Sequence, residues 1–343
     1  MSTNKPTRTR GRRIVTVLLL ALILCLLLTS CYTDASGERT NVFNAVLVRP
    51  FAFILRWIYD WCQSFGWAIL IFTVLTRLVL LPLNIKSKEG MAAMQALQPK
   101  TKELEKRYKN DQQKYQEEVA KLYKKEGVSP MSGCLPTLLS LPIMFALYWP
   151  ISQPLKYLMR LTASQITAVR EQLILVGAKV NGVLVSSTSS EMTLVQAIHD
   201  NFEAVRGISD NIFQMNLQFM GMNLGAVPSI RTFNLIFLLP IISAATSFLL
   251  SRLTVWLQTR TTGTAPDATQ QNKMMMWMMP LISLWIGFSL PAGLTLYWIA
   301  GNLFGILQEF LINYYLKWKK EKEPSKEADS SNDKISRSNR KKH

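Results

Sequence analysis

Residues Trp67–Leu83, WAILIFTVLTRLVLLPL, decide the fold class of this chain, because they form a long apolar run with one charged residue, Arg77. A helix of this length approaches the roughly 30 Å of hydrocarbon in a bilayer. Four further stretches are about as long and nearly free of charge: Gly133–Ile151, Phe233–Leu250, Met274–Leu290 and Leu294–Leu311. Buried core helices of a large soluble protein are the alternative, but they rarely give five such runs. The sequence therefore predicts an all-α polytopic membrane protein with five transmembrane helices.

The net charge of +17 is unevenly distributed over the 343 residues. Basic residues gather before Ile14, in Lys86–Lys125 and in Lys317–Lys342. A basic surplus can indicate nucleic acid, anionic lipid or the cytoplasmic side of a membrane protein. The third explanation accounts for most of the pattern, and it places the C-terminus in the cytoplasm.

The N-terminus reads as an export signal over residues 1–30. Basic residues precede the apolar run Ile14–Leu28, and Leu28-Thr29-Ser30-Cys31 follows. This tetrapeptide resembles the bacterial lipobox, in which a Cys is lipidated and becomes the first mature residue. An uncleaved first span with an incidental Cys is the alternative. We therefore expect the chain to be a lipoprotein, with Cys31 acylated on the outer face of the cell membrane.

Residues 31–65 are then an external segment. Within it, Phe43–Cys62 has apolar residues at helical spacing, which predicts an amphipathic helix lying in the outer interface. An ordinary packed helix is the alternative. The predicted apolar stripe comprises Phe43, Val46, Leu47, Phe51, Ile54, Leu55 and Ile58.

The five-helix core is predicted at 66–316. Its polar segment 84–127 is expected to form a cytoplasmic helical hairpin, with a turn at Asn110-Asp111. The segment 152–231 has few basic residues, which predicts an external loop with an amphipathic helix around Glu191–Val205. The basic tail 317–343 has almost no apolar residues and is predicted to be disordered.

No catalytic motif is present in the sequence, and the two histidines are His199 and His343. Neither a metalloprotease helix nor a nucleophile elbow nor a phosphate loop can be found. We therefore expect a protein that is not an enzyme and needs no cofactor or metal. A small-solute transporter or channel is the alternative function. It is disfavoured because the apolar stretches contain only Arg77 and Glu309, whereas carriers generally place paired ionisable groups near the midplane.

Arg77 has two interpretations. It can extend its side chain to the inner headgroups, or it can face a wet cavity between helices. The residues themselves leave both open.

A series of short motifs closely resembles the YidC family of membrane protein insertases. They are Gly66-Trp67, Leu81-Pro82-Leu83, Leu97-Gln98-Pro99-Lys100, Leu122-Tyr123-Lys124-Lys125, Pro130, Gly133-Cys134-Leu135-Pro136, Leu141-Pro142-Ile143 and Leu296-Tyr297-Trp298. The resemblance covers roughly Phe43–Lys317, except most of the external loop. It implies five transmembrane helices around a hydrophilic groove open to the cytoplasm. The lipobox, and the lack of a large extracytoplasmic domain, resemble Gram-positive members.

The resemblance also implies site residues. Arg77 matches the groove arginine of the family, and Thr246, Trp298 and Asn302 align with polar or aromatic positions of the last three spans. Ser140 and Ser251 stand where relatives often carry Gln, so this groove is expected to hold fewer amides.

The partners implied are nascent membrane proteins and lipoproteins, the Sec translocon, the ribosome with the signal-recognition-particle pathway, and the lipid bilayer. The protein is expected to act as a monomer in the cell membrane.

Two further patterns remain open at this point. Gly301 and Gly305 have the small-residue spacing of close helix packing, which favours contact with a span of the same chain over dimerisation. The cluster Met274–Met279 could contact client helices or serve ordinary packing.

Overall fold

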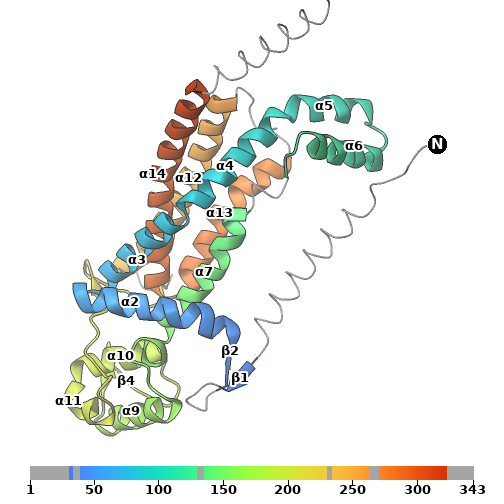
Figure 1. Ribbon diagram of the computed structural model, residues 1–343. Coiled ribbons are helices and arrows are strands. Elements are labelled where there is room, and N and C mark those ends of the chain that lie inside the picture. Colours follow the sequence, from blue (N-terminus) through green and yellow to red (C-terminus); the bar gives the residue numbers. More distant parts are fainter. Residues whose placement is uncertain (1–30, 34–38, 130–134, 230–233, 263–269, 323–343) are drawn as a thin grey trace, which may run out of the picture. The chain divides into compact units, whose positions relative to one another are not determined.

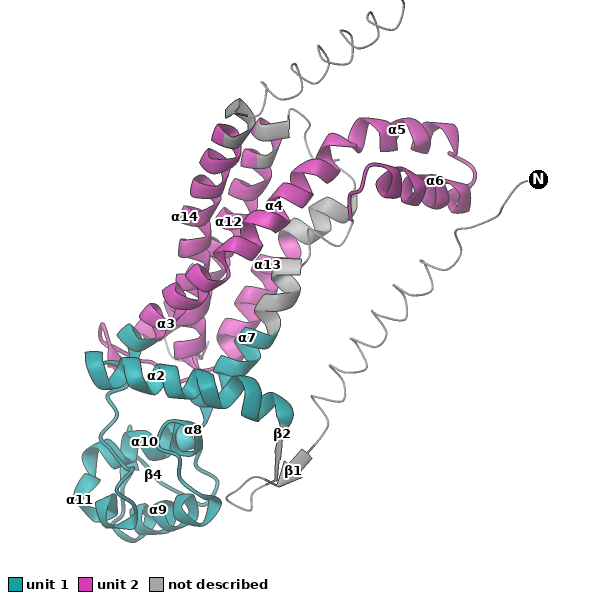
Figure 2. Cartoon of the chain, viewed as in Figure 1, with its two compact units in different colours: residues 1–68, 141–217 teal, residues 69–140, 218–343 magenta. Residues whose placement is uncertain are grey.

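The computed structural model describes residues 31–33, 39–129, 135–229, 234–262 and 270–322, most of them helical (Figure 1). The chain divides into two compact units (Figure 2). Unit 1 holds Met1–Ala68 and Leu141–Leu217, and unit 2 holds Ile69–Ser140 and Gln218–His343. The predicted signal peptide and the predicted tail beyond Lys322 lie outside the described residues.

Unit 1 is built from short elements around a small core. In chain order they are β1 Cys31–Thr33, β2 Arg39–Asn41, the π-helix η1 Asn44–Val48, α2 Arg49–Cys62, most of α7 Leu135–Ser152, α8 Pro154–Tyr157, α9 Ala163–Leu175, β3 Lys179–Val180, β4 Val183–Leu184, α10 Glu191–Asp200, α11 Phe202–Val205 and the 3-10 helix η3 Arg206–Ile208. The strands pair as antiparallel hairpins, β1 with β2 and β3 with β4.

Helix α2 is present where the sequence predicts a helix, but its buried face differs from the predicted stripe. The buried side chains of α2 are Ala52, Leu55, Ile58 and Tyr59, and Val48 at the end of η1 is also buried. Val46 and Ile54, assigned to the apolar stripe, are 62% and 39% exposed. Exposed apolar side chains at these positions are compatible with a face turned to the membrane interface, so the interfacial role of this helix stays a prediction.

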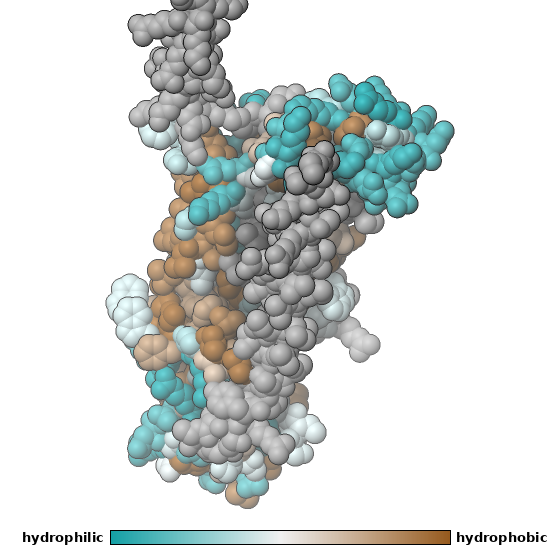
Figure 3. Space-filling view, turned by 45° about the vertical axis from the view of Figure 1, so that its right-hand side comes forward, coloured by the Kyte–Doolittle hydropathy of each residue, from teal (hydrophilic) through white to brown (hydrophobic). Residues whose placement is uncertain are grey.

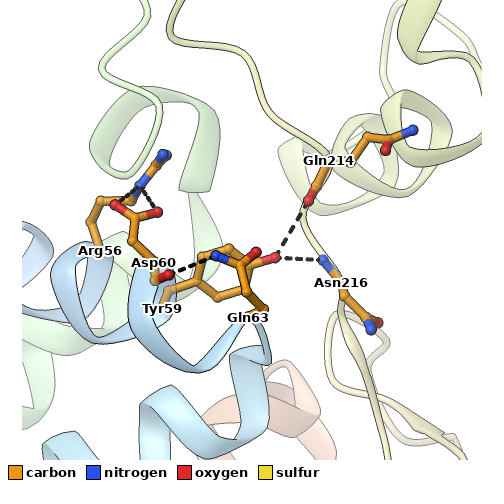
Figure 4. Close-up of polar contacts among 6 residues, drawn as sticks. All are labelled: Arg56, Tyr59, Asp60, Gln63, Gln214 and Asn216. Carbon is orange, nitrogen blue, oxygen red and sulfur yellow. Dashed lines mark hydrogen bonds and ion pairs between the residues drawn. The ribbon is translucent and has the colours of Figure 1, made fainter.

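Tyr59 joins α2 to residues Gln214 and Asn216, near the end of unit 1. Its hydroxyl accepts a hydrogen bond from Asn216 N at 3.0 Å and donates one to Gln214 O at 3.4 Å (Figure 4). Burial of the ring raises the pKa of the phenol. This pair of hydrogen bonds holds the segment at Gln214–Asn216 against the last turn of α2.

The predicted external loop folds into a lobe with its own core. Leu155, Val169, Leu173, Leu194 and Ile198 are all fully buried. The carboxyl of Glu191 accepts a hydrogen bond from Lys156 N at 3.2 Å, and burial raises its pKa. The part of this segment up to Leu217 is therefore a packed part of unit 1.

Two local signals in this lobe were present in the sequence and were overlooked. Thr162 and Gln165 form a capping box that begins α9. Asn181-Gly182 forms the two-residue turn of the β3–β4 hairpin, with φ of 51° and 79°. An Asn-Gly pair is the usual sequence for such a turn because both residues tolerate positive φ.

Unit 2 is built mainly from long helices. It contains most of α3 Phe65–Val79, then α4 Leu81–Ala96, α5 Gln98–Arg107, α6 Gln112–Lys125, the β5–β6 hairpin of Gln218–Phe219 and Met222–Asn223, the 3-10 helix η4 Leu235–Phe237, α12 Leu238–Thr262, α13 Gln270–Ser289 and α14 Ala292–Lys322. Helix α12 packs against both α13 and α14.

The first predicted span continues further than expected. Helices α3 and α4 meet at Leu80 with a bend of 54°. Pro82, in the first turn of α4, lacks the N–H that would continue the α3 hydrogen-bond ladder, so the bend falls just before it. The chain therefore stays helical to Ala96, and the helical pair predicted at 84–127 consists of α5 and α6, which follow α4.

The turn between α5 and α6 lies where the sequence predicts it. Asp111 caps α6 by accepting a hydrogen bond from Lys114 N at 3.0 Å, and this bond lowers the pKa of its carboxyl. Lys100 forms an ion pair of 2.7 Å with Glu126. This pair joins the start of α5 to the end of α6, at the ends away from the turn.

Within the described residues, two helices are long and apolar enough to cross a membrane, Leu235–Leu257 and Ala292–Trp318. The bent pair α3–α4 makes a third if it counts as one span, and Trp277–Ser289 is a shorter apolar helix. The count of five spans stays a prediction.

We predict that Gly287→Ala destabilises unit 2. A Cβ atom on Gly287 of α13 would lie 2.8 Å from Pro240 Cβ and 2.9 Å from Pro240 Cα on α12. Overpacking of this kind costs roughly 1–3 kcal/mol, which should exceed the gain of about 1 kcal/mol in helix propensity. Thermal unfolding of the purified chain in detergent should show a lower midpoint. Gly207→Ala is the control, since no atom lies within 4 Å of its added Cβ. An unchanged midpoint for Gly287→Ala would contradict the close α12–α13 contact.

Candidate functional site

Hydroxyl groups link α12 and α13 in the interior of unit 2. Ser243 and Ser283 share a hydrogen bond of 2.6 Å, and Ser247 Oγ donates to Ser283 Oγ at 3.2 Å. All three side chains are buried. Ser243 and Ser247 are four residues apart and therefore lie on one face of α12.

Asn302 of α14 completes this network. Its Nδ2 donates to Ser247 Oγ at 2.8 Å and to Thr246 Oγ1 at 3.1 Å. Trp298, one turn earlier, donates from Nε1 to Ser247 Oγ at 3.3 Å. The three helices α12, α13 and α14 thus meet around one hydroxyl, that of Ser247.

The surroundings of the network are apolar, which makes each hydrogen bond important. A buried polar group without a partner costs about 1–3 kcal/mol, and hydrocarbon offers no replacement partner. The hydrogen bonds therefore fix which faces of the three helices meet. Small residues assist, since a Cβ on Gly305 would lie 3.0 Å from Leu250 Cδ2.

Arg77 of α3 lies against α14. A Cβ atom on Gly301 would lie 2.7 Å from Arg77 Nη2, so the guanidinium packs directly against the backbone of Gly301 and would have to move to admit a larger residue. Arg77 is half-buried, and no carboxylate in the described part of the chain lies within 4.0 Å of it. Its charge is therefore not neutralised by a neighbouring side chain of the described residues.

Glu309 of α14, the acidic residue of the last apolar stretch, has a basic partner. It forms an ion pair with Lys88 of α4 and accepts a hydrogen bond from Thr254 Oγ1 of α12 at 3.0 Å. The side chains of Lys88 and Glu309 are 19% and 9% exposed. Glu309 Oε2 is buried and has no hydrogen-bond partner among the described residues. This pair joins α4, α12 and α14.

The outward faces of these helices are apolar, as Figure 3 shows in brown over the long helices of unit 2. Exposed side chains recur at helical spacing: Trp277, Leu281 and Trp285 on α13, and Leu303, Leu307, Phe310, Leu311 and Tyr314 on α14. Polar side chains buried inside and apolar ones exposed outside are typical of helices surrounded by lipid. The side chains of α5 and α6 are mostly hydrophilic by contrast (Figure 3).

The structure brings several predicted site residues together. Thr246, Trp298 and Asn302 share the network around Ser247, and Arg77 lies beside Gly301, next in the chain to Asn302. Ser251 lies one turn further along α12 and donates to Ser247 O at 2.9 Å. Ser140 belongs to α7, but its side chain, like that of Cys31, lies outside what the structure describes.

Residues missing from the predicted site are Ser243, Ser247, Ser283, Lys88 and Glu309. The recurrence of Ser243, Ser247 and Ser251 every four residues in an apolar stretch could have indicated the polar face of α12. Gly301 and Gly305 contact α3 and α12 of the same chain, which confirms the prediction of packing within the chain. Met274–Met276, part of the methionine cluster, have side chains outside the described set.

The comparisons with known proteins decide the family. The model of the family described as 60Kd inner membrane protein matches residues 57–321. A relative from Listeria monocytogenes serotype 4b, named membrane protein insertase YidC 1, is 28% identical over 340 residues, which are 96% of this chain and 93% of the relative. The chain belongs to the YidC family.

Some members of the YidC family are longer than this chain. The membrane protein insertase YidC of Wolinella succinogenes is 30% identical over 294 residues, covering 86% of this chain and 42% of the relative. A solved structure titled as an active YidC insertase with its first transmembrane domain resolved is 22% identical, with a TM-score of 0.44 over 85% of this chain and 49% of that one.

We predict that the Lys88–Glu309 pair stabilises unit 2 as a pair. Lys88→Ala or Glu309→Ala alone leaves a charge without its partner in a largely buried position and should cost about 3 kcal/mol. The double variant Lys88→Ala/Glu309→Ala should be more stable than the sum of the single effects implies. The measurement is denaturant unfolding of the full chain in detergent.

The control for this cycle is Lys121 with Glu118 on α6, an ion pair of 2.5 Å whose side chains are 68% and 33% exposed. It should show no measurable coupling, because water screens exposed pairs. Additive effects of Lys88→Ala and Glu309→Ala would contradict a stabilising pair at the α4–α14 contact.

Proposed function

We propose that this chain is a membrane protein insertase, without enzymatic activity, that moves nascent membrane proteins into the bacterial cell membrane. Membership of the YidC family and the insertase names of its relatives support this function. The apolar exterior of unit 2 agrees with a protein that works within lipid.

The observation that carries the proposal is Arg77, a cation within an apolar stretch that has no carboxylate partner in the described residues. A client span must move a short polar flank across the bilayer. One carboxylate at the bilayer centre costs about 2.5–3.5 kcal/mol on insertion scales. An arginine about 4 Å away returns about 4 kcal/mol at an effective dielectric constant near 20. Because the two values are comparable, Arg77 can hold an acidic flank briefly without trapping it.

The proposed groove is lined by Arg77, Thr246, Trp298, Asn302 and Ser251, with Ser140 contributed by α7. Five transmembrane helices would surround it, open to the cytoplasm. The hydroxyl and amide groups of α12 and α14 hydrogen-bond to one another. Polar groups of a client can exchange for these bonds at small net free energy, because each bond replaces a similar one. Burial of the apolar client residues in lipid then completes insertion, without a nucleotide.

We predict that the positive charge of Arg77, more than its shape, supports insertion of clients with acidic external tails. Arg77→Ala should block such clients, whereas Arg77→Lys should retain substantial activity because the charge is kept. Removing the acidic residues of the client tail should partly restore insertion by Arg77→Ala. The measurement is protease protection of client tails in cells that contain only the variant insertase.

Arg260→Ala is the matched control for Arg77→Ala. It removes the same charge from unit 2, but Arg260 lies near the end of α12 with its guanidinium 4.0 Å from the ring centroid of Trp256. This variant should insert acidic-tailed clients normally. If Arg77→Ala does so as well, Arg77 is an anchor to the inner headgroups and the proposed role is wrong.

The proposed topology places Cys31 outside and the C-terminus inside, with 84–127 in the cytoplasm and 152–231 outside. Its support is the distribution of Lys and Arg along the chain. Reporter fusions after Lys125 and Lys320 should therefore give cytoplasmic signals, and a fusion after Thr188 should give an external one. A cytoplasmic signal at Thr188 would exclude this topology.

The remaining partners are part of the same proposal. Acylation of Cys31 would add a lipid anchor to helices that already hold the chain in the membrane. The basic segments Lys86–Lys125 and Lys317–His343 would dock ribosomes and the signal-recognition-particle pathway through salt-sensitive phosphate contacts. The insertase would act as a monomer, alone or with the Sec translocon.

A further inference from the structure

A hollow of about 310 Å³ lies within unit 1, between α2, the segment after α8 and the segment after η3. Its volume is at the lower end of the range for small-molecule sites. Arg56, Asp60, Arg160, Asp210 and Asn211 supply its polar lining. All of these residues belong to unit 1, and none of them is among the residues of the proposed insertion site.

The guanidinium of Arg56 is fixed by Asp60 and by the ring of Phe213. Its Nε donates to Asp60 Oδ1 at 2.7 Å and Oδ2 at 2.9 Å, and its Cζ lies 3.5 Å from the ring centroid of Phe213 (Figure 4 draws the Arg56–Asp60 pair). The two Nη groups make no hydrogen bond within the described residues. Arg56 thus presents oriented donors to the hollow, and little side-chain freedom would be lost when a ligand binds.

Arg160 supplies a second cation from an unusual backbone conformation. Its φ is 53°, which L residues other than Asn, Asp and His rarely adopt. The flanking amides fix this conformation, since Met159 N donates to Pro154 O at 2.9 Å and Leu161 N to Leu155 O at 3.0 Å. The Arg160 guanidinium has no acidic partner among the described residues and lies 5.7 Å from the ring centroid of Phe53. Such strained positions often occur at binding sites.

The hollow also contains an acid that is not neutralised. Asp210 has no lysine or arginine nitrogen within 4.0 Å among the described residues, and Asn211 beside it offers an amide side chain. Since Asp60 already accepts from Arg56, the groups left for a ligand are Arg160, the outer donors of Arg56, and Asp210. They complement a molecule that carries both an anionic phosphate and a cationic ammonium group.

The apolar part of the lining indicates what such a molecule is attached to. Phe53, Trp57 and Trp61 form an aromatic stripe along α2 and are 57%, 67% and 76% exposed. Exposed Trp and Phe at this spacing are typical of helices that lie at the headgroup level of a bilayer. Phe53 and Trp57 also line the hollow, so it opens beside the surface that would contact acyl chains.

We propose that this hollow binds the headgroup of a phospholipid of the phosphatidylethanolamine class in the outer leaflet. Arg56 and Arg160 hold the phosphate, Asp210 holds the ammonium group, and the acyl chains follow the stripe of Phe53, Trp57 and Trp61. The bound lipid fixes the depth of α2 at the outer surface of the membrane.

The test uses the full chain in nanodiscs made from equal parts of phosphatidylethanolamine, phosphatidylglycerol and phosphatidylcholine with identical acyl chains. After partial delipidation, native mass spectrometry counts the lipids that remain bound. The wild type should retain phosphatidylethanolamine several-fold over the other two, because phosphatidylglycerol lacks the ammonium group and the choline ammonium has no N–H to donate.

Two variants separate the two parts of the headgroup. Arg160→Gln should lower retention of phosphatidylethanolamine about tenfold, equivalent to about 1.4 kcal/mol, and Arg160→Lys should restore part of it. Asp210→Asn should leave retention of phosphatidylglycerol unchanged and abolish the preference for phosphatidylethanolamine. Arg206→Gln is the matched control, because Arg206 is an exposed arginine of unit 1 that pairs with Glu203 and does not line the hollow.

Two results would overturn the proposal. One is retention of the three lipids in their input ratio by the wild type, or an unchanged ratio with Arg160→Gln. The other is binding of glycerophosphoethanolamine, which has the headgroup without acyl chains, as tightly as the intact lipid; the site would then belong to a soluble phosphate compound.

Discussion

Polar side chains inside an apolar bundle must find partners within that bundle, and unit 2 is organised around this constraint. Ser243, Ser247 and Ser283 hydrogen-bond across α12 and α13, and Asn302 connects them to α14. In lipid the apolar faces of helices gain little from meeting one another, so these bonds and the small residues beside them select the contacts. The exposed faces, rich in Trp, Leu and Phe, are then free to face hydrocarbon.

Glu309 and Arg77, the charged residues of the apolar stretches of unit 2, differ in whether they have an oppositely charged partner among the described residues. Glu309 and Lys88 neutralise each other, and the pair holds α4 against α14. Arg77 lies beside Gly301 without a carboxylate partner in the described residues. A neutralised pair contributes to structure, whereas an unneutralised cation attracts an external anion. This difference, more than the number of polar residues, supports assigning client binding to Arg77 and a structural role to Glu309.

Unit 1 combines a buried apolar core with an exposed aromatic face on α2. Leu155, Leu173, Leu194 and Ile198 form its buried core, as in any small domain. Helix α2 packs one apolar face against this core and exposes a second, aromatic face. Arg56 and Arg160 line a hollow together with Phe53 and Trp57 of that face, and this combination is the basis for the lipid site proposed in this unit.

The sequence by itself determined the helical class, the family and the identity of the unusual residues. Long apolar runs specify helices without reference to anything distant, and Arg77, Thr246, Trp298 and Asn302 were recognisable from family motifs. Only the tertiary structure decided which residues meet. Ser247 contacts Ser283 and Asn302, 36 and 55 positions away, and hydropathy carries no information about such pairs. The bend before Pro82, the buried face of α2 and the folded lobe of 152–217 also depended on packing. A periodic pattern shows that a helix has an apolar face, but the neighbours that the fold supplies decide whether that face meets protein or lipid.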